Sequence, residues 1–436
     1  MAKAYKAKWI ISASQQGQNV YENSALIVEE DKIAAIIPQE NVAEENFEEV
    51  IDYKNSIITP GFINLGTKLE FSKIDKNLVK VNSFKRFLLN LKQFFCMLGT
   101  PINSYPMQLS SIYKEYKLFS KKEKIESVKF GVEKSLLNGI TCVAEITNED
   151  LVIEVLNKLP IKKYYFFDLK SDSKNESKKV FFKLKKKIEK LLKNKKNKIK
   201  IGLYPHSIWS VHKSMWGVIS KYARKNKLPL MTEILESEDE KDFVEYGKSN
   251  LDYLNNFLGC KKIKYEKGKS AVEYLNELKV IDKNLIIKNG NFLTEEELLT
   301  LYENEVKFVY SPLTNKNEFK KSHSRALIQK YFPERFVFCT NQLSDEGKFS
   351  ILNEIFEVSE NIQIEELIKY LTIYPAKILN ISKTTGSLEP DKDADFNVFK
   401  LDKKQNMITD LRYNCNPTDV FISGQNIVKN GNISIN

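Results

Sequence analysis

The sequence has 436 residues, which is enough for a large domain with a smaller one attached. Hydrophobic residues make up 42% and charged residues 29%, as in ordinary globular proteins, and no apolar run reaches the roughly 20 residues of a membrane helix. The net charge of +11 comes mainly from lysines spread along the chain, so it indicates solvated surface lysines, and a nucleic-acid partner is not expected.

The N-terminus and the cysteines bear on location. The first residues lack the apolar core of a signal peptide. The cysteines are odd in number and scattered, without a Cys-x-x-Cys pair, at Cys96, Cys142, Cys260, Cys339 and Cys415. A reduced, cytoplasmic setting is therefore expected.

In chain order, short alternating segments come first and recur at the end. Residues 7–11, 24–28 and 32–37 read as strands near the N-terminus, and residues 394–399 and 419–424 near the C-terminus. Because chain termini commonly lie close in space, these segments predict one small β-sandwich domain built from residues 1–57 together with 386–436.

Between these ends, residues 58–385 alternate apolar strands with helical stretches, the pattern of parallel βα units. The candidate strands are 63–65, 139–144, 164–169, 199–203, 228–233, 285–289, 306–311 and 335–340. Eight such units predict an α/β fold, a (β/α)₈ TIM-like barrel.

Two helical stretches have special compositions. Residues 177–198 carry apolar side chains at helical spacing among many lysines, which predicts an outer barrel helix with a solvated face. Residues 84–98 are more apolar than a surface helix requires. They either cover the mouth of a site or pack in the core.

Several motifs in this order resemble the amidohydrolase superfamily. Residues 58–64 (ITPGFIN) resemble its first barrel strand, and 206–211 (HSIWSV) and 232–237 (TEILES) resemble its His-Ala-Pro-Tyr-Ser-Val and Thr-His-x-x-Glu-Ser segments. Residues 289–298 and 340–344 resemble two further segments. The resemblance is to the deaminase and chlorohydrolase branch, closest to aminodeoxyfutalosine deaminases. It implies hydrolysis of a C–N bond by metal-activated water, with Zn or Fe as the usual ion.

The family's metal-ligand positions carry other residues here: Gly66, Lys68, Glu233, Asn289 and Asn341 stand where the family has four histidines and an aspartate. Glycine has no donor, a lysine ammonium repels a cation, and asparagine offers a neutral oxygen. Only Glu233 is a good ligand. No metal or other cofactor is therefore expected, and Asn341 also lacks the basicity of the family's aspartate.

The resemblance assigns roles to three other residues. Glu236 stands at the position of the carboxylate that shuttles a proton to the substrate ring, so it is the catalytic candidate, although a structural salt bridge also explains it. His206 and Trp209 stand in the segment that contacts substrate, and a satisfied loop histidine is the alternative for His206. His212 is expected on the surface of the following helix, and His323 has no predicted partner.

Opposite charges at two of the replaced positions suggest a substitute for the metal. Lys68 on the first strand is predicted to place its ammonium where the family holds an ion, with Glu233 balancing it. Burying either charge alone costs several kcal/mol.

Three functions follow. The leading hypothesis is a metal-free, catalytically impaired protein of this fold that binds a ligand or acts as a scaffold. The second is a divergent C–N hydrolase, such as a deaminase of an aminopurine nucleoside, that uses Glu236 with Glu233 and Lys68. The third is a basic binding module for nucleic acid or an acidic partner. A small nucleoside-like ligand is the expected partner, a membrane is not, and a homo-oligomer is left open.

Overall fold

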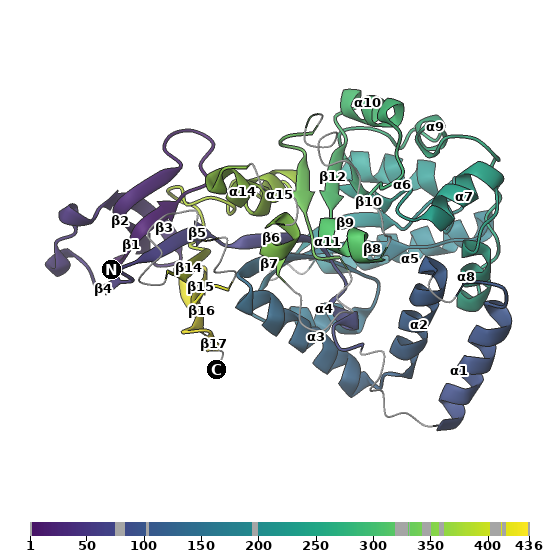
Figure 1. Ribbon diagram of the computed structural model, residues 1–436, viewed down its shortest axis with the longest axis horizontal. Helices are drawn as coiled ribbons and strands as arrows, with labels where there is room; N and C mark the ends of the chain where they lie inside the picture. Colours follow the sequence, from purple (N-terminus) through teal and green to yellow (C-terminus); the bar gives the residue numbers. More distant parts are fainter. Residues whose placement is uncertain are drawn as a thin grey trace.

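The computed structural model describes residues 2–74, 83–101, 104–193, 199–318, 330, 332–341, 350–356, 362–401, 411 and 416–434. Within these ranges, a barrel of parallel strands wrapped by helices lies beside a second sheet built from terminal strands (Figure 1). Both chain ends lie on the side of this second sheet in Figure 1. The predicted fold class, a (β/α)₈ barrel with a small β-domain formed by both termini, is confirmed.

The terminal strands form one mixed sheet in the order β17-β16-β15-β14-β5-β1-β2-β3, with β4 beside β1. Its strands are β1 (Ala2–Ile11), β2 (Val20–Glu29), β3 (Lys32–Pro38), β4 (Glu49–Asp52), β5 (Ser56–Pro60), β14 (Phe396–Lys400), β15 (Asp419–Ile422), β16 (Gln425–Lys429) and β17 (Asn432–Ile433). The two ends of the chain meet where β14 runs antiparallel to β5 and Val398 pairs with Ile58. The predicted boundaries at 57/58 and 385/386 stay a prediction.

The barrel strands follow one another in chain order, and each is parallel to its neighbour. They are β6 (Phe62–Thr67), β7 (Ile140–Thr147), β8 (Lys162–Leu169), β9 (Lys200–Pro205), β10 (Leu230–Glu233), β11 (Leu285–Lys288), β12 (Lys307–Tyr310) and β13 (Phe336–Phe338). Thr67 bridges to Asn341 next to β13, and the Asn64 amide donates to Thr340 Oγ1 at 2.8 Å. These contacts join the first strand to the last. All eight predicted strands are present.

Helices surround this barrel (Figure 1). They are α1 (Ser83–Cys96), α2 (Tyr105–Leu118), α3 (Lys121–Leu137), α4 (Asp150–Leu156), α5 (Lys174–Lys193), α6 (Lys213–Asn226), α7 (Glu238–Tyr246), α8 (Leu251–Leu258), α9 (Ala271–Glu277), α10 (Glu295–Glu303), α11 (Pro312–Glu318), α13 (Ile351–Phe356), α14 (Ile364–Leu371) and α15 (Ile373–Ile378). Among the described residues, no helix combines the length and the apolar character that crossing a membrane requires.

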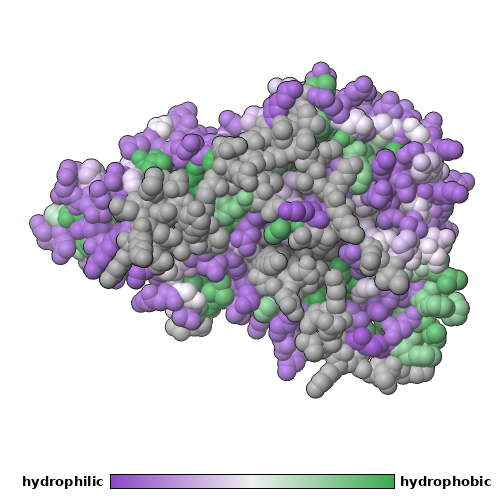
Figure 2. All heavy atoms as spheres, in the orientation of Figure 1, coloured by the Kyte–Doolittle hydropathy of each residue, from purple (hydrophilic) through white to green (hydrophobic). Residues whose placement is uncertain are grey.

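The two helical stretches with special compositions, residues 177–198 and 84–98, agree with their predictions to different degrees. As predicted, α5 is an outer helix, because Leu184 and Ile188 are buried whereas most of its lysines are exposed. Helix α1 does not bury its apolar face: Phe94 and Phe95 are 62% and 68% exposed. Figure 2 shows apolar residues gathered at the end of the molecule where α1 lies. The interpretation of residues 84–98 as a helix packed in the core is therefore wrong for much of α1.

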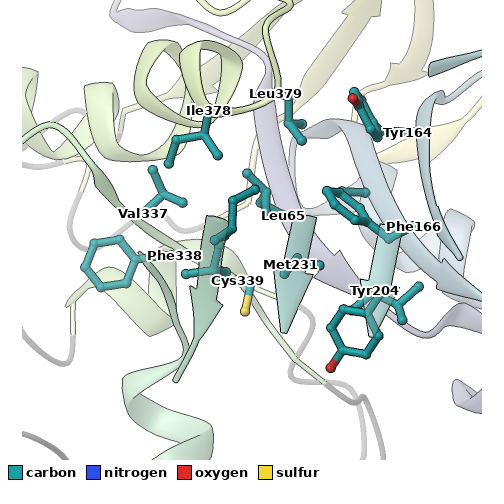
Figure 3. Close-up of a cluster of buried hydrophobic side chains, with 14 of the residues drawn as sticks. Leu65, Tyr164, Phe166, Tyr204, Met231, Val337, Phe338, Cys339, Ile378 and Leu379 are labelled. Carbon is teal, nitrogen blue, oxygen red and sulfur yellow. The ribbon is translucent and has the colours of Figure 1, made fainter. Parts of the chain in front are cut away.

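The barrel interior is filled by large apolar side chains (Figure 3). Leu65, Phe166 and Met231 come from three different strands and are fully buried, and Ile378 of α15 lies in the same cluster. Such packing makes the barrel a solid core and leaves the ends of its strands as the place for a site.

Candidate functional site

The five replaced ligand positions gather at the carboxyl ends of the barrel strands. Gly66 lies near the end of β6 and Lys68 just after it, Glu233 ends β10, Asn289 follows β11, and Asn341 follows β13. This is the end at which barrels of this type place their active sites. The segments predicted to form the site are thus brought together.

A small cavity lies among these residues, with room for about one water molecule. Its walls are Lys68, Tyr105, Leu109, Tyr113, His206, Glu233, Glu236 and Asn341. Three of these side chains come from α2, so α2 forms this wall of the cavity. Sequence analysis had considered only residues 84–98 for such a role.

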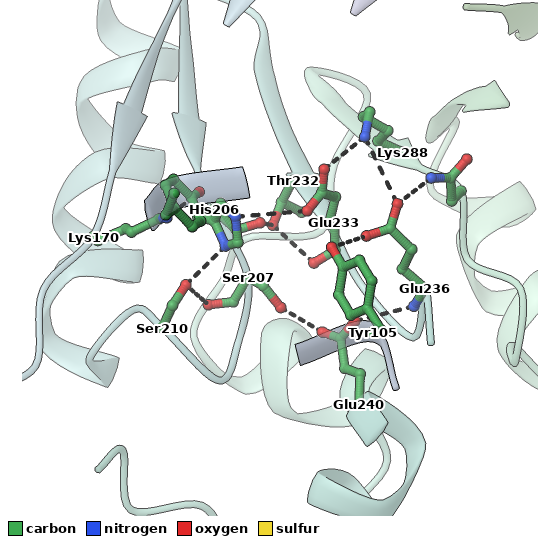
Figure 4. A network of polar contacts seen from close by, with 12 residues as sticks. Tyr105, Lys170, His206, Ser207, Ser210, Thr232, Glu233, Glu236, Glu240 and Lys288 are labelled. Atoms are coloured by element: carbon green, nitrogen blue, oxygen red, sulfur yellow. Dashed lines mark hydrogen bonds and ion pairs between the residues drawn. The ribbon is translucent and has the colours of Figure 1, made fainter. Parts of the chain in front are cut away.

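The cation that balances Glu233 is Lys288, the last residue of β11. Its ammonium lies 2.6 Å from Glu233 Oε1 and 3.7 Å from Glu236 Oε1, and all three side chains are buried (Figure 4). Burial raises the pKa of Glu233, but Lys288 outweighs this effect, with help from His206 and Lys68, and holds that pKa well below its ordinary value. The predicted Lys68–Glu233 pair is therefore replaced by Lys288–Glu233, and Lys68 acts on Glu233 only through its more distant charge.

Gly66 explains how Lys288 fits. Its φ is +141°, which side chains rarely adopt, and a Cβ built on it would lie 3.7 Å from Lys288 Cε and 3.6 Å from Cys339 Sγ. The lysine stem therefore lies in front of the glycine. Any long side chain at position 66 would compete with Lys288 for the same space.

Glu236 is held at the cavity by several hydrogen bonds. The Tyr105 hydroxyl donates to its Oε2 at 3.0 Å, and the Asn289 amide donates to its Oε1. Burial, followed by the neighbouring Glu233 carboxylate, raises the pKa of Glu236 to about 7, while Lys288 opposes that rise. A carboxyl group with this pKa exchanges its proton near neutral pH.

The two asparagines at replaced positions have left-handed backbones, with φ of +64° at Asn289 and +53° at Asn341, a conformation that asparagine tolerates well. Asn289 belongs to a buried amide network. Its Oδ1 accepts from Ser311 Oγ at 3.1 Å and from the Asn315 amide at 3.0 Å. With its oxygen accepting two bonds and its amide nitrogen donating to Glu236, Asn289 orients the carboxylate and has little left to offer a metal.

His206 lines the cavity, whereas Trp209 does not. The His206 Nε2 lies 3.7 Å from Glu233 Oε2, and its Nδ1 shares a hydrogen bond of 3.0 Å with Ser210 Oγ. Burial, followed by the charge of Lys170, lowers the pKa of His206 to about 3, so the ring is neutral near pH 7. Trp209 is buried edge-on against this ring and supports it.

His212 is outside the site. His212 caps α6, where its side chain accepts from the Ser214 backbone N–H at 3.2 Å. His323 lies outside the described residues.

Glu145 of β7 fixes the two residues that flank Lys68. Glu145 accepts hydrogen bonds from Thr67 Oγ1 at 2.5 Å and from the Leu69 backbone N–H at 2.8 Å, on either side of Lys68. The Lys68 side chain is only 7% exposed. Burial lowers its pKa, but Tyr113 and the carboxylates of Asp168 and Glu233 more than compensate and raise it, so the ammonium stays charged.

These donors do not fit the divalent ion that the resemblance implies. Glu233 is paired with the Lys288 ammonium, and the Asn289 side-chain oxygen already accepts hydrogen bonds. Lys68 adds a second positive charge, which would repel a metal ion. Among the described residues, no group of three or more His, Cys, Asp or Glu side chains is placed to hold a metal. Zinc prefers imidazole, thiolate or carboxylate ligands, and this site offers one histidine and two carboxylates, of which Glu233 is paired with Lys288 and Glu236 is hydrogen-bonded to Tyr105 and Asn289.

The eight-stranded parallel barrel, with a polar cavity at its strand ends and a sheet of terminal strands attached, places the chain among the (β/α)₈-barrel proteins. A model of the amidohydrolase family matches residues 57–427. The chain belongs to the amidohydrolase family, in its deaminase and chlorohydrolase branch.

Three known proteins illustrate the branch. An adenosine deaminase of Helicobacter pylori is 25% identical over 86% of this chain and 88% of its own. The structure of Helicobacter pylori aminofutalosine deaminase superimposes with a TM-score of 0.75, at 20% identity over 98% of this chain and 100% of that one. A triazine hydrolase matches with a TM-score of 0.72, at 16% identity over 99% and 96%. At such identities the structural matches show the fold alone.

Sequence reasoning missed Lys288, Tyr105 and Tyr113. Lys288 was counted as part of a strand candidate, although a lysine that ends a run of buried apolar residues at the carboxyl edge of a barrel is itself a signal. The tyrosines gave no comparable signal, because α2 reaches the site through tertiary packing that no local pattern encodes.

Proposed function

We propose that this chain is a metal-independent member of its family that has lost metal-assisted deamination and retains a closed polar pocket for a small ligand. The observation that carries the proposal is the buried Lys288–Glu233 ion pair at 2.6 Å, which lies among the replaced ligand positions. The relatives named above act on nucleosides or triazines, and a small nucleoside-like ligand remains the proposed partner. The four cysteines among the described residues are free thiols, which supports the proposed cytoplasmic setting.

The physical argument is one of charge replacement. A divalent ion bound at Glu233 would have to displace the Lys288 ammonium or lie beside it, with Lys68 close by. Either arrangement buries like charges together, and leaving a buried charge unpaired costs about 3–5 kcal/mol. Lys288 already supplies the positive charge that Glu233 needs.

Metal analysis tests this proposal directly. The full chain, purified under mild conditions and then dialysed against zinc or ferrous iron, is expected to carry well below one equivalent by mass spectrometry. The Helicobacter pylori adenosine deaminase, treated identically, serves as the positive control for loading. One tightly bound equivalent in this chain would refute the proposal.

A second candidate is a divergent C–N hydrolase, favoured by the position of Glu236. Glu236 lines the cavity and is oriented by Tyr105 and Asn289, and a proton on it could pass to a substrate nitrogen. In this scheme Glu236, having given its proton to the substrate nitrogen, takes one back from the attacking water, and Lys68 stabilises the negative charge that develops.

Ammonia release separates the two candidates. Adenosine, 5′-methylthioadenosine and aminofutalosine are incubated with the full chain, with Glu236→Gln, and with Glu238→Gln, an exposed neighbour on α7. The first candidate predicts no release above the Glu236→Gln background. Release that is lost in Glu236→Gln but kept in Glu238→Gln would establish the hydrolase instead.

A further inference from the structure

Three buried ammonium groups lie around the site, and two of them have a close polar partner. The Lys288 ammonium lies 2.6 Å from Glu233 Oε1, and Lys170 Nζ donates a hydrogen bond to the Tyr113 hydroxyl at 3.0 Å. Lys68 is the third ammonium. Within the described ranges it makes no hydrogen bond and no ion pair closer than 4.0 Å, and it lies only 6.0 Å from the centre of the Tyr204 ring.

Lys68 also lines the cavity, so its ammonium, which no described protein acceptor reaches, faces the cavity. A buried ammonium without a partner is costly, because its three N–H donors have left water and found no acceptor. Its side chain is 93% buried, since 7% is exposed. The arrangement is therefore one in which a ligand, and not another side chain, supplies the missing acceptor.

Two other donors face the same cavity. The Tyr113 hydroxyl accepts a hydrogen bond from Lys170 Nζ at 3.0 Å through its oxygen, which leaves its own proton to donate. The Asn341 side chain also lines the cavity, and within the described part of the chain its amide makes no hydrogen bond. Lys68, Tyr113 and Asn341 thus offer donors from β6, α2 and the end of β13.

The carboxylates that share the cavity do not cancel this attraction. Glu233 is neutralised by Lys288, and Glu236 accepts hydrogen bonds from Tyr105 and Asn289. Among the described residues, Lys288 has a carboxylate within 4.0 Å and Lys170 has the Tyr113 hydroxyl, whereas Lys68 has neither and is stabilised by Asp168 and Glu233 only from a greater distance.

We propose that this cavity binds one small monoanionic group, either a free halide-sized ion or the carboxylate end of a ligand, through Lys68, Tyr113 and Asn341. The size of the cavity, about one water molecule, limits the buried part of the ligand to that single group. This inference deepens the proposed function by naming the chemistry of the ligand, and it rests on that proposed function.

Thermal unfolding of the full chain tests it, with sodium formate, bromide or acetate as the probe and ionic strength held constant with sodium sulfate. A ligand that binds only the folded state raises the midpoint progressively above its dissociation constant. Formate and bromide are expected to raise it, and acetate less, because of its extra methyl group. A stronger effect of formate indicates a carboxylate ligand, and a stronger effect of bromide a free ion.

Two variants identify the site. Lys68→Met keeps the length of the side chain but removes the charge, and it is expected to weaken binding by about tenfold or more, the scale of a hydrogen bond to a charged group. Lys178→Met removes an exposed lysine of α5 and should bind like the unmodified chain. Equal responses of Lys68→Met and the unmodified chain, or no response of the unmodified chain to any probe, would overturn the proposal.

A crystal of the unmodified chain grown with bromide removes any dependence on folding of the variants. An anomalous peak within hydrogen-bond distance of Lys68 Nζ supports the proposal. Peaks confined to the surface would show an adventitious ion only and would overturn it. Metal content and ammonia release are measured independently, so failure here is distinguishable from failure of the proposed function.

Discussion

At the scale of single residues, the site replaces a bound cation with cations that belong to the chain. Lys288 provides the charge next to Glu233, and Gly66 provides the space for its stem. The two substitutions fit together, since a long side chain at position 66 would compete with the Lys288 stem for space and a shorter residue at position 288 would leave Glu233 without its close cation.

The first prediction concerns this pair. Lys288→Met should lower the free energy of unfolding at pH 7 by about 3–5 kcal/mol, because it leaves Glu233 buried and charged. The double variant Lys288→Met with Glu233→Gln should recover most of the loss. Urea unfolding measures both, and Lys3→Met, which breaks an exposed pair with Glu49, should change stability by less than about 1 kcal/mol.

The pH dependence of this pair has a definite sign. The folded pKa of Glu233 is held below its ordinary value of 4.5, so its contribution is present above that value and is lost as the pH falls towards the folded pKa. The double variant should therefore lose less stability than the unmodified chain between pH 5 and pH 3. Parallel acid-unfolding curves would contradict the assignment.

The contribution of Glu236 to stability changes with pH in the opposite direction. Its pKa of about 7 lies above the ordinary 4.5, so its contribution is fully present below 4.5 and is lost as the pH rises through 7. Glu236→Gln removes this titration and should raise stability at pH 8 relative to pH 5 by on the order of 2–3 kcal/mol compared with the unmodified chain. Urea unfolding at both pH values measures it, with Glu238→Gln as the unchanged reference.

How far the site could be predicted from sequence follows from these residues. The motif register placed Gly66, Lys68, Glu233, Asn289 and Asn341 at one end of the barrel, because the ends of parallel strands must converge there. It did not identify which lysine meets Glu233. Which lysine meets Glu233 depends on the space beside Gly66 and on the direction in which β11 ends. Both become known only once the barrel is closed.

At the scale of elements, the strands were predictable and the wall of the cavity was not. Each barrel strand is a short run of buried apolar residues, which periodicity detects. Helix α2 has no such distinction, and only its packing gives Tyr105, Leu109 and Tyr113 their place at the cavity. The more conspicuous α1, which sequence composition singled out, instead leaves Phe94 and Phe95 exposed.

Helix α2 yields a prediction about ligand size. Leu109 is 4% exposed and lines the cavity, so Leu109→Ala should enlarge it and destabilise the fold by about 2–5 kcal/mol. The larger cavity should accept acetate nearly as well as formate, measured as the shift of the thermal midpoint. Leu118→Ala, on the same helix but away from the cavity, should be destabilised without any change in this selectivity.

At the scale of the whole molecule, a half-buried lysine joins the barrel to the terminal sheet. Lys162 of β8 contacts Asp393 Oδ2 and Asp395 Oδ2, each at 2.5 Å, and Asp393 also pairs with Lys32 of β3. Asp395 further accepts from Thr385 Oγ1 at 2.8 Å. One cluster of charges therefore connects a barrel strand, the returning chain and the N-terminal strands.

Lys162→Met should uncouple these parts. The Asp395 side chain is 1% exposed, so removing its cation leaves a buried charge and should cost about 3–5 kcal/mol. Hydrogen exchange should then show β1 and β14 opening before β8, whereas in the unmodified chain the two regions should open together. Lys200→Met, at an exposed position that starts β9, is the matched control. If the terminal sheet and the barrel still exchange together in Lys162→Met, the charge cluster is not what couples the two parts. The direct connection of β5 to β6 is then sufficient to couple them.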